Sequence, residues 1–230
     1  MTSVKERFLN VKKEIKTIAE NCGRNPHDIL LVAVSKKQTC EIINKGIDAG
    51  IDILGENYIQ EAIDKIERIG NKTVSWHFIG HLQSNKAKYA VKYFDLIHSV
   101  DTIKLAREID KQAKKINKIQ NILMQINISG EASKSGADKK DAIMLAQQIS
   151  MLSNINLQGL MGMPPFYNDP EKARPYFAAL FNIRAAINNE NIKGVNLLHL
   201  SMGMSGDFQT AIEEGSTMVR VGTAIFGPRQ

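Results

Sequence analysis

The chain has 230 residues, with a hydrophobic content of 43% and a charged content of 23%, which is an ordinary globular composition. Its net charge of +6 is spread along the chain, and no aromatic residues alternate with the densest lysine run, residues 111–118, which disfavours nucleic-acid binding. No apolar run is long enough to span a membrane, the N-terminus lacks a signal-peptide core, and Cys22 and Cys40 have no metal or redox spacing. We therefore expect a cytoplasmic protein.

The spacing of apolar residues predicts a leading helix followed by eight strands that alternate with helices. Val4, Phe8, Val11 and Ile15 recur every three or four positions, which predicts a helix over residues 3–21. The predicted strands cover residues 30–36, 51–57, 76–80, 96–100, 121–128, 157–163, 197–202 and 217–223. The helices expected between them cover residues 41–47, 58–69, 84–93, 101 onward, 138–152, 170–188 and 207–215.

This alternation, without a domain-sized break, predicts one α/β domain over residues 1–230, folded as a single (β/α)8 barrel (TIM barrel) with an additional N-terminal helix. An open, doubly wound sheet is the alternative, but the GxGxxG fingerprint expected after its first strand is absent. The sequence ends soon after the eighth strand, so we expect no closing helix there and place the leading helix in that position.

The carboxyl ends of the strands in such a barrel face one mouth, where this fold places its chemistry. Lys36 is the nucleophile candidate at this mouth, because partial desolvation would make its amine available to attack a carbonyl. The alternative is a lysine that simply ends a strand in solvent. No carboxylate pair and no metal-ligand spacing accompany it, so we expect no metal site.

Two loops of small residues, at the ends of strands seven and eight, predict a phosphate site. Residues 201–207 read SMGMSGD, and residues 221–227 read VGTAIFG. Glycine lets the backbone approach an anion, hydroxyls donate hydrogen bonds, and barrels often bind phosphate at these two strands. Tight turns alone are the alternative. A carbonyl-seeking lysine beside a phosphate site is typical of a sugar-phosphate aldolase or of a pyridoxal phosphate protein.

Arg220 discriminates between these two ligands. It precedes Gly222 by two residues, so both share one strand face and point toward the barrel mouth. An arginine there could donate a hydrogen bond to a pyridine nitrogen and keep it unprotonated, because two cations would repel. The ring would then be a weaker electron sink than it is beside an aspartate. The alternative role for Arg220 is a structural ion pair with Glu213, Glu214 or another carboxylate.

Motifs along nearly the whole chain resemble those of the YggS/PROSC family of pyridoxal phosphate homeostasis proteins, which are relatives of the alanine racemase barrel (fold type III). These motifs are VAVSK at 32–36, GENY at 55–58, HFIGHLQSNK at 77–86, LSMGMSGD at 200–207 and VRVGTAIFG at 219–227. The resemblance implies that pyridoxal 5′-phosphate is the cofactor.

The resemblance also implies a role for each matching residue. Lys36 would form the Schiff base, and Arg220 would be the partner of the pyridine nitrogen. The phosphate would be held by Ser201, Gly203, Gly222 and Thr223, while Asn57 and His81 would line the pocket. Residues 129–136 resemble the Ser-Lys-Ser-Gly segment of the family, in which the role of Lys134 stays open.

Family members are described as having no established catalytic activity, so the resemblance implies binding, buffering and delivery of the cofactor to apoenzymes. The racemase relatives take a second acid/base tyrosine from a C-terminal β-domain, and we expect this chain to end before such a domain and to be a monomer. Three alternatives stay open. They are a slow racemase or another fold type III enzyme, a Schiff-base aldolase without cofactor, and an interaction protein that uses the lysine-rich helix.

Overall fold

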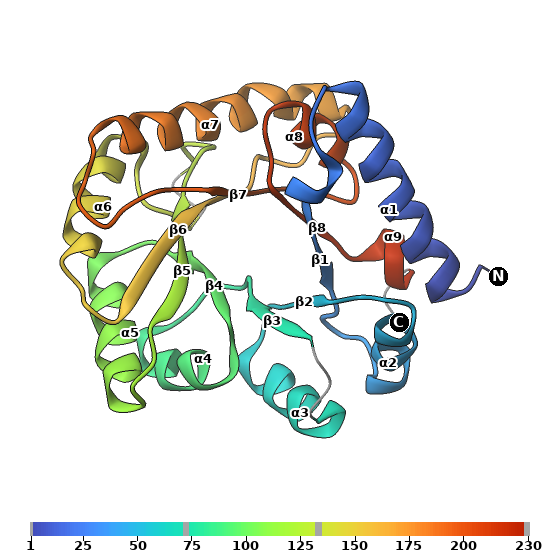
Figure 1. Ribbon diagram of the computed structural model, residues 1–230, viewed down its shortest axis with the longest axis horizontal. Coiled ribbons are helices and arrows are strands. Elements are labelled where there is room, and N and C mark those ends of the chain that lie inside the picture. The colour runs from blue at the N-terminus through green and yellow to red at the C-terminus, as the bar shows by residue number, and fades with distance from the viewer. Residues whose placement is uncertain (1, 71–73, 132–134, 228–230) are drawn as a thin grey trace.

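The structure is a computed structural model, and it describes residues 2–70, 74–131 and 135–227. Its strands are β1 (Leu30–Val34), β2 (Ile53–Glu56), β3 (Ser75–Phe78), β4 (Leu96–Val100), β5 (Gln120–Ile126), β6 (Ile155–Gly162), β7 (His199–Met204) and β8 (Met218–Val221). Within the described residues they form one closed parallel barrel, in which each strand pairs with the next and β8 pairs with β1 (Figure 1). The predicted (β/α)8 architecture is confirmed.

Helices surround the barrel and follow the expected order (Figure 1). Three of the predicted helices begin as short 3-10 turns, at residues 84, 139 and 170. The helical segments are α1 (Val4–Asn21), η1 (Pro26–Asp28), α2 (Cys40–Asp48), α3 (Ile59–Ile69), η2 (Ser84–Lys86), α4 (Ala87–Tyr93), α5 (Ile103–Lys115), η3 (Lys139–Asp141), α6 (Ala142–Ser150), η4 (Pro170–Ala173), α7 (Arg174–Asn189), α8 (Phe208–Glu213) and α9 (Thr223–Phe226). Among the described residues, no helix combines the length and the apolar content that crossing a bilayer requires.

The leading helix α1 begins at a capping box. Ser3 Oγ accepts a hydrogen bond from the Glu6 N–H at 3.2 Å, and the Ser3 N–H donates to the Glu6 carboxylate at 2.7 Å. The apolar face of α1 buries Phe8, Val11 and Ile15, as the spacing predicted. The helix lies beside α9 and α8 on the outside of the barrel (Figure 1), in the position expected for it.

One expectation about the end of the chain is wrong, because the short helix α9 follows β8. The N–H groups of Ile225 and Phe226 both donate to the Gly222 carbonyl, at 3.0 and 2.9 Å. This turn buries Ile225 and Phe226, and Arg7 of α1 donates from Nε to the Ile225 carbonyl at 2.7 Å. Burial of two large apolar side chains favours a helical turn where small residues suggested a loop. Helices α1 and α9 therefore share the last position in the outer layer.

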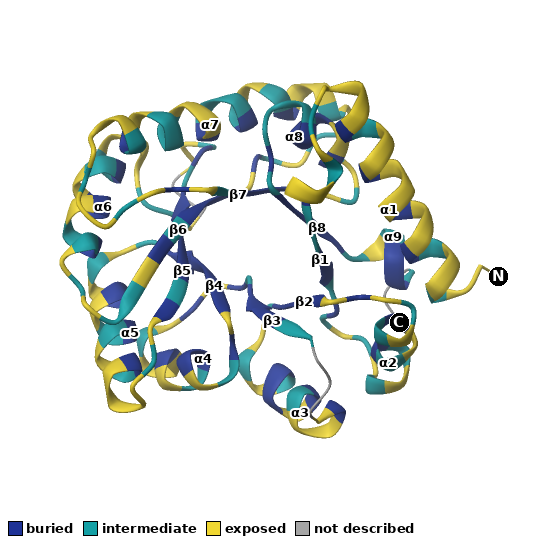
Figure 2. Ribbon diagram, viewed as in Figure 1, coloured by how far each residue is buried: buried dark blue, intermediate teal, exposed yellow. Residues whose placement is uncertain are grey.

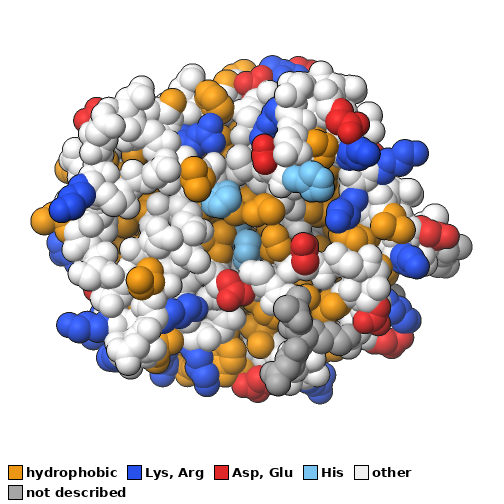
Figure 3. Space-filling model, in the orientation of Figure 1, with side chains coloured by type: hydrophobic (Ala, Val, Ile, Leu, Met, Phe, Trp, Pro, Cys, Tyr) orange, Lys and Arg blue, Asp and Glu red, His pale blue; other side chains and the backbone are white. Residues whose placement is uncertain are grey.

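The core has two parts, one inside the barrel and one between the barrel and its helices. Figure 2 shows buried strands and helices whose exposed residues face outward, and Figure 3 shows hydrophobic and histidine side chains near the centre of the face in view. The interior apolar layer is built from Leu96, Leu123, Met161 and Met218, with Leu30 packed against it. Side chains two residues further along a strand lie in the next layer. That next layer contains the buried polar residues His98, Gln125 and Arg220, which lie beneath the candidate site.

Candidate functional site

A cavity of about 480 Å³ opens at the carboxyl ends of the strands, and we call it the mouth pocket. Its volume lies within the range of roughly 300–1,000 Å³ that is typical of small-molecule sites. The wall combines polar groups with an apolar rim. It is lined by Val34, Lys36, Asn57, Ile79, Met163, Pro164, Pro165, Phe166, Tyr167, Pro170, Ala173, Met204, Ser205, Gly206, Asp207, Arg220, Gly222 and Thr223. Five of the eight site residues expected from the sequence meet here: Lys36, Asn57, Arg220, Gly222 and Thr223.

Lys36 enters the mouth pocket from the turn that follows β1. This turn is closed by the Gln38 N–H, which donates to the Ser35 carbonyl at 3.0 Å. The Lys36 side chain is half-buried and lines the pocket together with Arg220, from the strand next to β1. Lys36 therefore does not simply end a strand in solvent.

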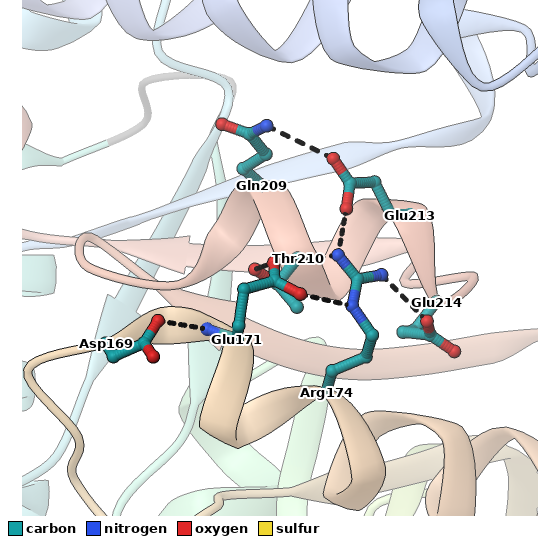
Figure 4. Close-up of polar contacts among 7 residues, drawn as sticks. All are labelled: Asp169, Glu171, Arg174, Gln209, Thr210, Glu213 and Glu214. Carbon is teal, nitrogen blue, oxygen red and sulfur yellow. Dashed lines mark hydrogen bonds and ion pairs between the residues drawn. The ribbon is translucent and has the colours of Figure 1, made fainter.

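Arg220 lies at the base of the mouth pocket and is only 4% exposed. Its guanidinium donates to Ser201 Oγ at 2.7 Å and to the Gly162 carbonyl at 3.2 Å. Burial lowers the pKa of Arg220 to about 10, so the side chain stays cationic at neutral pH. An ion pair with Glu213 or Glu214 is wrong, because both carboxylates bind Arg174 instead (Figure 4). Another carboxylate, Asp207, lines the same pocket, and its charge opposes the effect of burial on the pKa of Arg220.

A chain of buried hydrogen bonds continues inward from Arg220. Ser201 Oγ lies 2.9 Å from His98 Nδ1, and His98 Nε2 lies 3.0 Å from His77 Nδ1. Burial lowers the pKa of His77 to about 4, and burial, with the nearby charges of His77 and Arg220, lowers the pKa of His98 well below its usual value. Both rings are therefore neutral at physiological pH. With neutral rings, the Ser201 O–H donates to His98 Nδ1 and the His98 Nε2–H donates to His77 Nδ1. Each hydrogen bond then has one donor and one acceptor.

Neither histidine was expected at the site, because the candidate positions were those at the ends of strands and both histidines lie within strands. His77 lies in β3, and His98 lies in β4, two residues after the apolar interior residue Leu96. Period-two spacing from Leu96 is the signal that places His98 inside the barrel. The contact between the two histidines depends on how neighbouring strands are staggered, which the sequence does not specify.

Three of the expected site residues lie outside the wall of the mouth pocket. The Ser201 hydroxyl is buried between Arg220 and His98. Gly203, at φ +91°, packs against α8, where an added Cβ would lie 2.6 Å from the Ala211 Cβ. His81 is exposed and lies near Asp101; burial raises the pKa of Asp101, and the charge of His81 opposes that effect. Their proposed contacts with a cofactor stay predictions. Lys134 lies outside the described residues.

Asn57 and Gly222 are two positions of the pocket wall that bear on a ligand. Asn57 Oδ1 is buried and, among the described residues, has no hydrogen-bond partner. A buried polar atom without a partner is costly, so this side chain is arranged to contact something else. A Cβ on Gly222 would lie 3.4 Å from the Val34 carbonyl oxygen, which is ordinary van der Waals contact, so the packing of β8 against β1 does not by itself require glycine here. Because Asn57 Oδ1 is an acceptor, it fits a ligand that presents a hydrogen-bond donor to this part of the pocket.

The apolar rim comes from the segment between β6 and η4, which the sequence analysis did not assign to the site. Phe166 is 86% exposed at this rim, and Tyr167 Oη lies 3.0 Å from Tyr176 Oη. At the end of the neighbouring strand β7, Asp207 accepts a hydrogen bond from the Met204 N–H at 2.6 Å and so shapes the loop of Ser205 and Gly206. A separate groove of about 680 Å³, between α1, η4 and α8, lies behind that loop; Lys36 and Arg220 do not line it.

Comparison with known proteins agrees with this architecture. The sequence profile of the family "Alanine racemase, N-terminal domain" matches residues 10–230. A pyridoxal phosphate homeostasis protein of Aquifex aeolicus is 41% identical over 225 residues, with 98% of each chain covered. The structure of PipY from Synechococcus elongatus PCC7942 with PLP bound superposes with a TM-score of 0.86 at 32% identity, covering 98% of this chain and 100% of that one. An alanine racemase of Clostridium difficile 630 shares the fold at a TM-score of 0.71 and 15% identity, covering 94% of this chain and 56% of that one.

Proposed function

Because the chain belongs to the alanine racemase N-terminal domain family, and within it to the pyridoxal phosphate homeostasis proteins, we propose that it binds pyridoxal 5′-phosphate in the mouth pocket and serves in the homeostasis of that cofactor. The observation that carries this proposal is the meeting of Lys36, Arg220 and the unpartnered Asn57 Oδ1 in one cavity of suitable size. The PLP-bound relative PipY supports the choice of ligand.

Lys36 is the proposed covalent anchor. Its side-chain amine would hold the cofactor through the aldehyde group that the cofactor supplies. Gly222 and Thr223 are placed to hold the phosphate, with backbone N–H groups and one hydroxyl. Asn57 offers its side-chain amide to the cofactor. We propose that Ser201 acts indirectly, by orienting Arg220, and that Gly203 acts by letting α8 pack closely. His81 would lie at the outer edge of the mouth pocket.

Arg220 would hold the pyridine nitrogen by donating a hydrogen bond. When bound, this cofactor stabilises negative charge at the substrate carbon, and it does so best when its ring nitrogen is protonated. A guanidinium disfavours that protonation, because two neighbouring cations repel. Ser201 accepts from Arg220 and so fixes the direction in which the remaining donors point. The site therefore favours storage of the cofactor over catalysis, and we propose a monomeric, non-catalytic carrier in the cytoplasm that can release the cofactor to apoenzymes.

A slow racemase is the second candidate, and Tyr167 is the observation that favours it. This tyrosine lines the mouth pocket, where an acid/base group could reach a ligand. Its hydrogen bond with Tyr176 raises the pKa of Tyr167, which makes it a poor base at neutral pH. Incubation with L- and D-alanine, followed by chiral analysis, distinguishes the candidates. Racemisation that Tyr167→Phe abolishes would favour the enzyme.

The experiment that tests the proposal is a visible absorption spectrum of the purified protein, before and after borohydride reduction. We expect a yellow protein, and a reduced adduct that peptide mass spectrometry locates on Lys36. Lys36→Ala should lose the adduct, whereas Lys45→Ala, which removes an exposed lysine of α2, should keep it. An adduct on another lysine would contradict the anchor. A colourless protein that cannot be loaded would contradict cofactor binding and favour a sugar-phosphate aldolase.

A further inference from the structure

The turn that carries Lys36 contains an unfavourable backbone conformation. Lys36 and Lys37 are the two central residues of the turn that Ser35 and Gln38 close. Lys37 has a φ of +61°, in the left-handed region. The third position of such a turn normally favours glycine, because a side chain there is strained. A residue other than glycine persists in this conformation only where the surrounding structure holds it.

A buried network of charged side chains surrounds this turn. Lys65 Nζ, on α3, donates to the Ser35 carbonyl at 2.7 Å, to Glu56 Oε1 at 2.7 Å and to Glu61 Oε1 at 2.6 Å. Glu56 Oε1 also accepts from Ser35 Oγ at 2.6 Å. Glu61 Oε1 also accepts from the Lys37 N–H. The three donors of the Lys65 ammonium are all used, and the bonds reach the residues on both sides of Lys36.

Burial makes this network a demanding arrangement. Lys65 is 5% exposed and Glu56 is fully buried, and charges in such places must be paired to persist. A hydrophobic group in place of a buried ion pair often stabilises a protein as well or better, so stability alone does not explain the arrangement. What an apolar replacement could not do is accept a hydrogen bond from the Lys37 N–H and donate one to the Ser35 carbonyl. These are the bonds that fix the turn.

We propose that Glu61, Lys65 and Glu56 are positioning residues for Lys36, which fix the direction of its side chain into the mouth pocket by holding Ser35 and Lys37. This inference rests on the proposed role of Lys36 as the cofactor anchor. Helix α3 then has a function besides covering the barrel. Through Glu61 and Lys65 it sets the position of the Lys36 amine, although Lys36 follows a different strand, β1.

Glu61 offers the sharpest test because its side chain is 28% exposed, so its replacement is compatible with folding. Glu61→Ala removes the acceptor for the Lys37 N–H, and Glu61→Gln keeps an acceptor oxygen. Glu61→Asp keeps the carboxylate, but its side chain is one methylene group shorter, so the carboxylate lies further from the Lys37 N–H. Glu41→Ala is the matched control, because Glu41 also pairs with a lysine four residues later, at 2.7 Å, but on the exposed face of α2.

The measurement is the rate at which Lys36 becomes labelled by pyridoxal phosphate, trapped by borohydride and read by mass spectrometry, well below the unfolding temperature. We expect Glu61→Ala to be slower by about tenfold or more, since a small misplacement of a reacting group has a large effect on rate. Glu61→Gln should recover most of the rate, Glu61→Asp should lie between them, and Glu41→Ala should match the wild type. The pH dependence of the visible band should shift in Glu61→Ala only.

The outcomes separate this inference from the proposed function. Labelling of Glu61→Ala at the wild-type rate, with wild-type protein labelled on Lys36, would overturn the positioning role and leave cofactor binding intact. An unlabelled wild-type protein would overturn both. If Glu61→Ala does not fold, Glu61→Asp decides: wild-type labelling by that variant would overturn the inference, and slower labelling would support it.

Discussion

Two clusters in this protein join one cation to several carboxylates, and they differ mainly in burial. Lys65 binds Glu56 and Glu61 behind β1, with 5% of the lysine exposed. Arg174 binds Glu171, Glu213 and Glu214 on the outside of α7 and α8, where its side chain is 34% exposed (Figure 4). The Arg174 cluster makes more ion pairs, but water screens it.

The difference shows that the number of ion pairs does not predict which cluster matters more for stability. An exposed pair gains little, because solvent competes for both charges and salt screens them. A buried pair gains little over an apolar replacement, yet breaking it leaves one charge stranded without water. Burial raises the pKa of Glu56 although Lys65 opposes the effect, which marks this carboxylate as strongly dependent on its partner. The Arg174 cluster therefore joins helices, and the Lys65 cluster determines a local geometry.

Lys65→Met should have the largest effect on stability, because it leaves Glu56 buried without its cation. We expect the free energy of unfolding to fall by about 3–5 kcal/mol. Without the cation, the folded-state pKa of Glu56 should rise further, so folding would favour its protonated form. That contribution is present at low pH and is lost as pH rises, so the deficit should be larger at pH 8 than at pH 5.

Urea unfolding of Lys65→Met at both pH values, beside Lys45→Met, checks this prediction. Lys45 pairs with Glu41 at 2.7 Å on an exposed face, and its replacement should change the free energy of unfolding by less than about 0.5 kcal/mol. Equal losses in the two variants would show that burial does not separate these lysines.

The buried His77 and His98 are uncharged, so their effect on stability should appear as a dependence on pH. Burial lowers the pKa of His77 to about 4, below its value in the unfolded chain, so the unfolded state binds the proton more tightly. Its stabilising contribution is present above pH 6.5 and is lost as pH falls toward 4, by an amount on the order of 3 kcal/mol. Unfolding measured from pH 7.5 to 4.5 should show this loss, and His77→Gln should reduce it. An unchanged profile in His77→Gln would contradict the prediction.

Replacing Asn57 tests whether its buried Oδ1, which has no hydrogen-bond partner among the described residues, serves to bind the ligand. Asn57→Ala removes no hydrogen bond from Oδ1, so the free energy of unfolding should change little, while the affinity for pyridoxal phosphate should fall by about tenfold. Spectral titration and thermal unfolding measure the two effects. Asn44→Ala is the matched control, because Asn44 Oδ1 is also buried and unpartnered but lies away from the mouth pocket. Equal affinity losses in both variants would remove Asn57 from the proposed site.

Arg174→Met should have the smallest effect, although this arginine makes three ion pairs. We expect the free energy of unfolding to fall by about 1 kcal/mol or less, and the difference from wild type to shrink at high salt. Unfolding curves at low and high salt check this. A loss as large as that of Lys65→Met would mean that the cluster acts as a network despite its exposure.

The sequence predicted the barrel and the residues at its mouth because both follow from local patterns. Apolar periodicity located the strands, and the end of each strand placed Lys36, Asn57 and Arg220 at one rim. The boundaries were less accurate: α9 was missed, since its helical turn depends on burial of Ile225 and Phe226.

The supporting contacts could not be predicted, because they depend on three-dimensional register. Lys65 is buried on helix α3, as are Ile63 and Ile69. Because lysine is usually exposed, the residue type of Lys65 did not indicate this burial. Its partners Glu56 and Ser35 belong to two other segments. The motif that contains Ser201 did not reveal that its hydroxyl contacts Arg220 and His98. Motifs identify which residues gather at a site, and packing determines which atoms they contact.

The pairing of β1 with β8 has a consequence for how the protein is made. Val32 of β1 is the register partner of Arg220, so the two walls of the mouth pocket come from the earliest and the latest strands of the barrel. Pairing between strands so far apart in the sequence is slow to form, because closing so long a loop costs conformational entropy. The mouth pocket is therefore complete only when the ring closes, and a ligand that binds there stabilises closed barrels alone. Occupancy of the pocket would report that the barrel of an individual molecule has closed.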